Sequence, residues 1–111
     1  MIDQVRPGDL ETWMRAQSGL AVVLDVREPR ELALASLQPQ GFELLAIPMN
    51  QLPARLAELD PGRPVACLCH HGTRSQHVAM FLASNGFGQV ANISGGIEAW
   101  ALERDAAVPR Y

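Results

Sequence analysis

The chain contains no lysine, and its nine basic residues, all arginine, stand against twelve acidic residues, which gives a formal net charge of −3. The arginines are spread along the chain, so the sequence has no basic patch of the kind that attracts a nucleic-acid backbone. This absence argues against nucleic acid as a partner. We see no charge run, internal repeat or low-complexity tract either.

Long apolar runs are also missing. No continuous stretch approaches the roughly 20 residues that an α-helix needs to cross a bilayer. The sequence also lacks the charged and apolar regions of a secretory signal peptide. With 111 residues and a hydrophobic fraction of 48%, we expect one globular domain over residues 1–111, located in the cytoplasm, with no membrane partner.

Cysteine is scarce: the chain has only Cys67 and Cys69. On a strand their side chains would share one face, with Cα atoms about 6.6 Å apart. That separation is near the upper limit for a disulfide, and free thiols persist in the cytosol. We therefore expect two free thiols, with Cys67 inside the strand as a core residue and a second, resolving thiol as the alternative for it.

What the sequence does contain is an alternation of short apolar runs with helical patterns. Such alternation predicts an α/β domain with a mostly parallel central sheet and helices on both faces. The expected strands cover residues 21–26, 44–47, 65–69 and 90–93, and the helical patterns begin near Asp9, Pro29, Asn50, Arg74 and Gly96. Ligands of such sheets bind outside the carboxyl ends of the strands. Residues 25–27 and 69–71 should both lie there.

Cys69 ends the third of these runs and is followed by a turn of His70, His71, Gly72, Thr73 and Arg74, with Ser75 as a cap for the next helix. A turn over a helix N-terminus directs backbone N–H groups inward, and together with the helix dipole it favours an anion. We therefore expect Cys69 to be a thiolate at neutral pH. Such a sulfur could attack an oxyanion or accept a sulfane sulfur.

The neighbouring side chains leave alternatives open. Arg74 could pair with an incoming anion or brace the turn. Asp25 should pair with Arg27 or Arg74, because an unpaired carboxylate at the end of a buried strand would be costly. Arg27 could also steer anionic substrates or be an exposed structural residue. We place Asp25 and Arg27 in a supporting role behind the site.

The two histidines of the turn have several possible roles. The Cys-x-Cys-His-His spacing lacks the two separated ligand pairs of a structural zinc site, so we expect no metal. We expect the side chains of His70 and His71 to face solvent and their N–H groups to face the sulfur. Gly95 and Gly96 could mark only a strand-to-helix turn, or could also form one wall of a pocket.

Three segments together resemble the rhodanese-domain sulfurtransferases: AVVLDVRE, CHHGTRS and SGGIEAW, in the family's order and spacing. The resemblance implies a rhodanese-like three-layer fold, with a fifth strand near Asp3–Val5. It implies that Cys69 becomes a persulfide, loaded by a donor such as thiosulfate and unloaded by cyanide or another thiol, without a cofactor. Glutathione persulfide, a cysteine desulfurase and a partner protein also remain open as sulfur sources.

Two other functions are compatible with this resemblance. Related phosphatases and arsenate reductases have one more residue between cysteine and arginine than the four that separate Cys69 from Arg74, which disfavours them here. A protein-binding module or a persulfide carrier without turnover is the second alternative. The chain also departs from the family between Ala35 and Pro48, where a Gly-His-Ile and Pro-Gly-Ala pattern is common and absent here.

Overall fold

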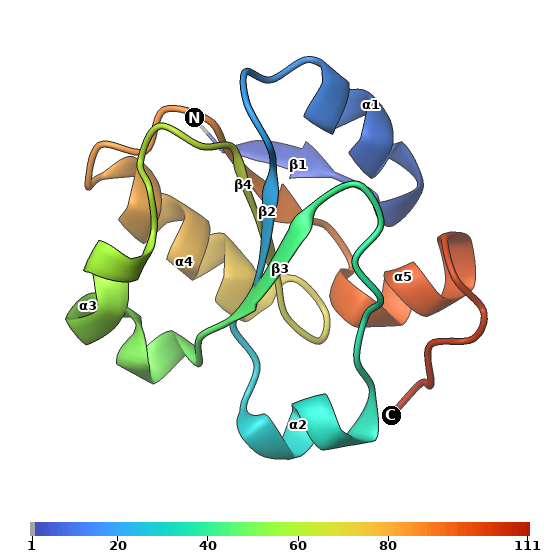
Figure 1. Ribbon diagram of the computed structural model, residues 1–111. Coiled ribbons are helices and arrows are strands. Elements are labelled where there is room, and N and C mark those ends of the chain that lie inside the picture. The colour runs from blue at the N-terminus through green and yellow to red at the C-terminus, as the bar shows by residue number, and fades with distance from the viewer. Residues whose placement is uncertain (1) are drawn as a thin grey trace.

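A computed structural model describes residues 2–111 and contains a five-stranded sheet in the order β1-β5-β4-β2-β3 (Figure 1). All four pairings between neighbouring strands are parallel. The strands are β1 (Asp3–Val5), β2 (Val22–Asp25), β3 (Glu43–Ala46), β4 (Val65–Leu68) and β5 (Val90–Ile93). The expected α/β fold with a parallel sheet is confirmed, and so is the short first strand that only the family resemblance indicated.

Helices cover both faces of this sheet, which gives three layers (Figure 1). The α-helices are α1 (Leu10–Arg15), α2 (Pro29–Leu34), α3 (Leu52–Arg55), α4 (Thr73–Ala83) and α5 (Gly96–Glu103). Three 3₁₀ turns, η1 (Pro7–Asp9), η2 (Met49–Gln51) and η3 (Leu56–Glu58), flank α1 and α3. Helices α1 and α5 pack into one apolar cluster and α3 and α4 into the other, while α2 lies beyond the end of β2.

The two apolar clusters follow the alternation of side chains along the strands. Leu68 faces the cluster that contains Trp13 and Trp100, whereas Cys67 and Cys69 face the cluster of α3 and α4. Both cysteines are free thiols, as expected. Cys67 is completely buried, and this burial raises the pKa of its thiol, which suits a core residue rather than a reactive one.

Some element boundaries differ from the predictions. The pattern from Asn50 predicts one helix, but the chain forms η2, α3 and η3 in succession. Helix α4 begins at Thr73, because Gly72 adopts a φ of 107° and takes the N-cap position. Ser75 is therefore not the cap, contrary to the prediction. The segment after Ala35, which departs from the common family pattern, has no regular structure before β3. It buries Leu37 and Phe42 in the core.

In residues 2–111 no helix has the length and apolar character required to cross a membrane.

Candidate active site

The sulfur of Cys69 lies just beyond the end of β4, inside the turn that leads into α4. We call residues 69–75 the Cys69 loop. Cys69 Sγ accepts hydrogen bonds from the backbone N–H of Gly72 at 3.1 Å and of Ser75 at 3.4 Å. Among the backbone N–H groups of residues 70–75, which we expect to point inward, those of Gly72 and Ser75 make the contact. Both donors reach the sulfur from the turn and the first residues of α4, so the sulfur is hydrogen-bonded on the side of the loop.

Ser75 places a hydroxyl as well as an amide beside this sulfur. Its Oγ lies 3.2 Å from Cys69 Sγ and 2.5 Å from Asn92 Oδ1. A hydroxyl has one hydrogen to donate, so Ser75 can donate either to the sulfur or to Asn92, but not to both. An anionic Cys69 would compete for that hydrogen. Ser75 thus supports the site from the third residue of α4 rather than from its cap.

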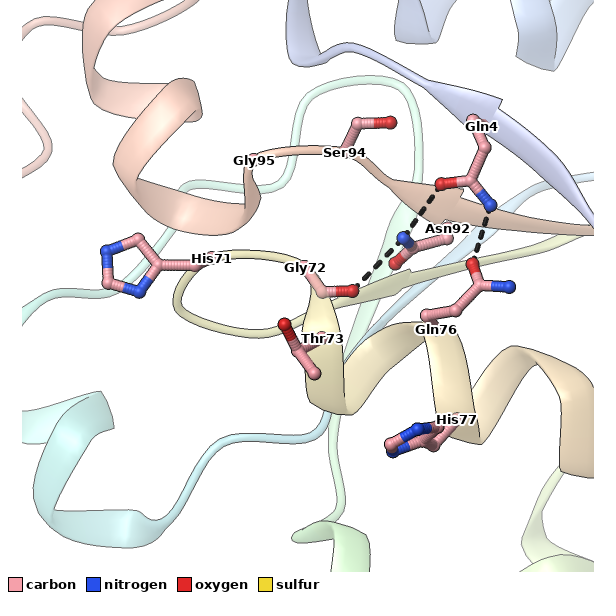
Figure 2. Close-up of a pocket in the computed structure, with 9 residues that line it drawn as sticks. All are labelled: Gln4, His71, Gly72, Thr73, Gln76, His77, Asn92, Ser94 and Gly95. Carbon is pink, nitrogen blue, oxygen red and sulfur yellow. Dashed lines mark hydrogen bonds between the residues drawn. The ribbon is translucent and has the colours of Figure 1, made fainter.

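Asn92 fixes the position of the loop from β5. Its Nδ2 donates to the carbonyl of Gly72 at 3.1 Å and to Gln4 Oε1 at 3.0 Å, and Gln4 in turn donates to Gln76 at 2.5 Å (Figure 2). Sequence reasoning missed Asn92. The available signal was a polar residue inside the buried strand β5, where a polar side chain requires partners.

Arg74 points toward α2 and braces the loop. Its guanidinium donates two hydrogen bonds to the Glu31 carboxylate, at 2.6 and 2.8 Å. The bond from Arg74 lowers the pKa of Glu31 to about 2, with a further contribution from the hydroxyl of Tyr111, against the opposing effect of burial. The same pairing raises the pKa of Arg74. Of the two roles considered for Arg74, this geometry corresponds to the bracing one.

Asp25 pairs with Arg27 rather than with Arg74. The Arg27 Nε and Nη2 groups donate to the Asp25 carboxylate at 2.9 and 2.7 Å. Arg27 is 0% exposed and donates also to the carbonyls of Glu31 and Ala35 and to the Tyr111 hydroxyl. The prediction that Arg27 is an exposed or substrate-steering residue is therefore wrong, because its guanidinium is enclosed by these acceptors.

The two loop histidines differ in their surroundings. The ring of His70 stacks between those of His71 and Tyr111, with centroids 3.9 Å apart on each side, and its Nε2 is buried without a hydrogen-bond partner among residues 2–111. His70 is half-buried, so the expectation that it faces solvent is met only in part, whereas His71 is exposed as expected. No sequence pattern indicated that Tyr111 would close over the loop.

A possible group of metal ligands also includes His70 and His71. Their nitrogen atoms and a carboxylate oxygen of Glu98 lie within 4.8 Å of one another. Glu98 pairs with Arg110, however, and the two imidazole rings lie face to face instead of converging on one point. This arrangement is not a preformed tetrahedral site.

The turn after β5 supports the loop directly. The N–H groups of Ile97 and Glu98 donate to the carbonyls of Cys69 and His70, at 2.9 and 3.2 Å. Gly96 has a φ of 60°, and a Cβ at this position would lie 2.4 to 2.5 Å from the same two carbonyl oxygens. Only glycine allows the two segments to approach this closely.

A polar hollow of about 430 Å³ lies beside the loop (Figure 2). It is lined by Gln4, His71, Gly72, Thr73, Gln76, His77, Asn92, Ser94 and Gly95. Gly95 therefore forms part of a pocket wall, which was one of the two possibilities considered for Gly95 and Gly96. Cys69 is only 1% exposed and does not line the hollow, but Gly72, which donates to its sulfur, does.

Comparison with known proteins gives consistent results. Residues 7–103 match the rhodanese-like domain. The chain is 41% identical over 95 residues to the rhodanese-like/PpiC domain-containing protein 12, chloroplastic, of Arabidopsis thaliana, covering 82% of this chain but only 30% of that protein. It is 35% identical over 80 residues to a sulfurtransferase of Allochromatium vinosum, covering 72% of this chain and 71% of the relative.

A solved structure shows the same fold. The crystal structure of a rhodanese-related protein from Thermoplasma volcanium has a TM-score of 0.76 and 30% identity, and the match covers 92% of this chain and 93% of that one. The parallel sheet, the position of Cys69 after β4 and the match over residues 7–103 agree with one another. The chain belongs to the rhodanese-like domain family.

Proposed function

We propose that this chain is a sulfurtransferase in which Cys69 carries the transferred sulfur as a persulfide. The observation that carries the proposal is the set of donors at Cys69 Sγ: two backbone N–H groups and the nearby Ser75 hydroxyl. These groups stabilise a thiolate before the reaction and an anionic outer sulfur after it. The family membership and the relative named as a sulfurtransferase support the same activity.

The reaction would proceed in two steps through a covalent intermediate. The Cys69 thiolate attacks the sulfane sulfur of a donor such as thiosulfate; the new S–S bond forms, the donor's S–S bond breaks, and sulfite leaves with the bonding electron pair. A thiophilic acceptor such as cyanide or a thiol then attacks the outer sulfur. Cleavage of the Cys69 S–S bond releases the product, thiocyanate in the case of cyanide, and restores the thiolate.

The burial of Cys69 bears on how the sulfur is reached. Because the residue is 1% exposed, the atoms that cover Sγ have to move aside before a donor can contact it. This observation favours a second candidate function, a persulfide carrier that exchanges sulfur with a partner but turns over small molecules slowly. A phosphatase is disfavoured by the four-residue spacing and by Arg74, whose guanidinium is held by Glu31.

The proposal is tested by loading the purified protein with sulfur. We expect incubation with a sulfane donor to raise the intact mass by one sulfur atom, and added cyanide to remove that mass and yield thiocyanate. Cys69→Ser should not load, whereas the matched variant Cys67→Ala should load normally. Loading that persists in Cys69→Ser contradicts the assignment. A single loading event without turnover favours the carrier, and hydrolysis of an aryl phosphate without loading favours a phosphatase.

A further inference from the structure

Tyr111 joins the Cys69 loop to α2, although it belongs to neither segment. The chain after α5 runs back to α2 (Figure 1). There the Tyr111 hydroxyl donates to Glu31 Oε2 at 2.7 Å. The Tyr111 ring stacks on the ring of His70, with centroids 3.9 Å apart and planes 13° from parallel. Because His70 directly follows Cys69, one side chain contacts both the loop and the helix beside it.

The Tyr111 hydroxyl also connects two ion pairs. Arg27 Nη1 donates to this hydroxyl at 3.1 Å, which leaves the hydroxyl hydrogen for Glu31. Arg27 is paired with Asp25 at the end of β2. Glu31 is paired with Arg74, the second residue of α4. Hydrogen bonds between side chains therefore run through Tyr111 from the end of β2 to the start of α4.

The backbone and the ring of His70 are held by different neighbours. The N–H of Glu98 donates to the His70 carbonyl at 3.2 Å. The Nε2 of the ring has no hydrogen-bond partner among residues 2–111, so stacking on His71 and Tyr111 holds the ring. His71 belongs to the same loop and is exposed. Of the two stacked neighbours, Tyr111 is therefore the one that ties the ring to the rest of the molecule.

We propose that Tyr111 is a positioning residue for sulfur transfer at Cys69, an inference that rests on the proposed function. Its ring holds His70, and its hydroxyl anchors that ring to α2. The turn then keeps the shape in which the N–H groups of Gly72 and Ser75 donate to Sγ. Tyr111 acts through the loop and not on the reacting atoms.

The first experiment measures single-turnover loading of Cys69 by intact mass, with thiosulfate and with cysteine hydropersulfide as donors. Tyr111→Leu removes the ring and the hydroxyl and should lower the maximum loading rate about tenfold with either donor. Tyr111→Phe keeps the stacked ring and should load within about threefold of the unaltered chain. The donor concentration for half-maximal rate should change less than about twofold, because Tyr111 does not bind the donor.

The matched control for this experiment is Phe42→Leu, which also replaces an aromatic ring by leucine. Phe42 packs against Trp100 and directly precedes β3. It thus lies at the opposite end of the parallel sheet from Cys69, which follows β4. Urea denaturation measures the stability of each variant. Phe42→Leu should destabilise the fold without slowing the loading of Cys69, and equal slowing in both variants would overturn the positioning role.

The second experiment does not depend on sulfur transfer. Iodoacetamide alkylates cysteine thiolates, and peptide masses identify the modified residue. Because Cys69 is 1% exposed, its alkylation requires the loop to open. Tyr111→Leu should speed alkylation of Cys69 by at least about threefold, although it slows loading, because the loop opens more often and is less well formed. The completely buried Cys67 is the internal control and should stay unmodified.

The third experiment tests the stacked pair by spectroscopy. Tyr111 is the single tyrosine of the chain, so the phenolate absorbance reports on it alone. Burial raises the pKa of Tyr111, the hydrogen bond from Arg27 lowers it, and the bond to Glu31 raises it. His70→Ala uncovers one face of the ring and should move the phenolate titration toward lower pH. An unchanged titration would overturn the inference, because the two rings would then not be in contact.

The outcomes separate this inference from the proposed function. Loading at the unaltered rate in Tyr111→Leu contradicts the positioning role and leaves the sulfurtransferase intact. A higher half-maximal donor concentration with an unchanged maximum rate also contradicts it, because Tyr111 would then contact the donor. Failure of both donors to load the unaltered chain contradicts the proposed function, whereas unchanged alkylation of Cys69 in Tyr111→Leu contradicts only the positioning role.

Discussion

The two flanks of the Cys69 loop use polar groups in different ways. Toward α4 and β5, neutral groups of Ser75 and Gly72 contact the sulfur, and Asn92 forms hydrogen bonds with both of these residues. Toward α2, full charges are paired: Arg27 with Asp25, and Arg74 with Glu31. The comparison shows that ion pairs brace the loop on the α2 side, whereas neutral groups make the hydrogen bonds to the sulfur on the other side.

Breaking the buried pair on the α2 flank should have the largest effect. Arg27→Met leaves the Asp25 carboxylate buried without its partner, and we expect a loss of about 3–5 kcal/mol in the free energy of unfolding. Urea denaturation measures this loss. Arg55→Met, which breaks the exposed pair with Glu58, should leave the stability nearly unchanged. Equal losses in the two variants would contradict a special role for the buried pair.

The contact between the loop and α5 should give the next largest effect. Gly96→Ala forces a side chain into the left-handed region and against the carbonyls of Cys69 and His70, at a cost of at least about 2 kcal/mol. Gly88→Ala is the matched control, because a Cβ at Gly88 meets no heavy atom within 4 Å. A fully stable Gly96→Ala that loads sulfur normally would show that the two segments need not approach this closely.

Removing a neutral donor tests the other flank. Ser75→Ala deletes the hydroxyl shared by Cys69 and Asn92, and leaves Asn92 Oδ1 without that donor. We expect a loss of about 1–2 kcal/mol in stability, and slower loading of Cys69 with sulfur. Ser36→Ala, which removes an exposed hydroxyl bonded to the Leu32 carbonyl, should affect neither measurement. Unchanged loading in Ser75→Ala would limit the role of the hydroxyl to packing.

Acid should weaken the pairing of Glu31 with Arg74 on the α2 flank, and the loss of stability should be smaller than in the three variants above. Because the pKa of Glu31 is lowered to about 2, its pairing stabilises the fold fully above the ordinary glutamate pKa near 4.5. This contribution is lost as the pH falls from about 4.5 through about 2. Unfolding free energies measured across this range should decline less steeply in Glu31→Gln than in the unaltered chain. Identical slopes would contradict the contribution of the pair.

The sheet could be predicted from the sequence because its strands are short, apolar and locally encoded. The runs that became β2, β4 and β5 are buried on both faces, and Pro29 occupies the first position of α2 as expected. The three residues of β1 are too few for a periodic pattern, and only the family resemblance indicated them. Gly72 adopts a positive φ, which glycine in such a turn readily allows.

The contacts that join distant segments could not be predicted in this way. Arg74 and Glu31 are separated by 43 positions, and no local rule pairs them. The same holds for Tyr111, whose hydroxyl reaches Glu31 across 80 positions. Arg27 was expected at the surface because arginine usually is, yet four acceptors gathered by the fold enclose it. The prediction that Ser75 caps the helix is wrong because Gly72 takes the N-cap position and α4 begins at Thr73.

The hydrogen bonds from Ile97 and Glu98 to the carbonyls of Cys69 and His70 have a consequence for protein engineering. The shape of the sulfur-holding segment depends on a helix that begins more than twenty positions later in the chain. Grafting the heptapeptide CHHGTRS onto an unrelated scaffold should therefore transfer the sequence of the loop but not its conformation. A working transplant would have to include the di-glycine corner and the first turn of the helix behind it.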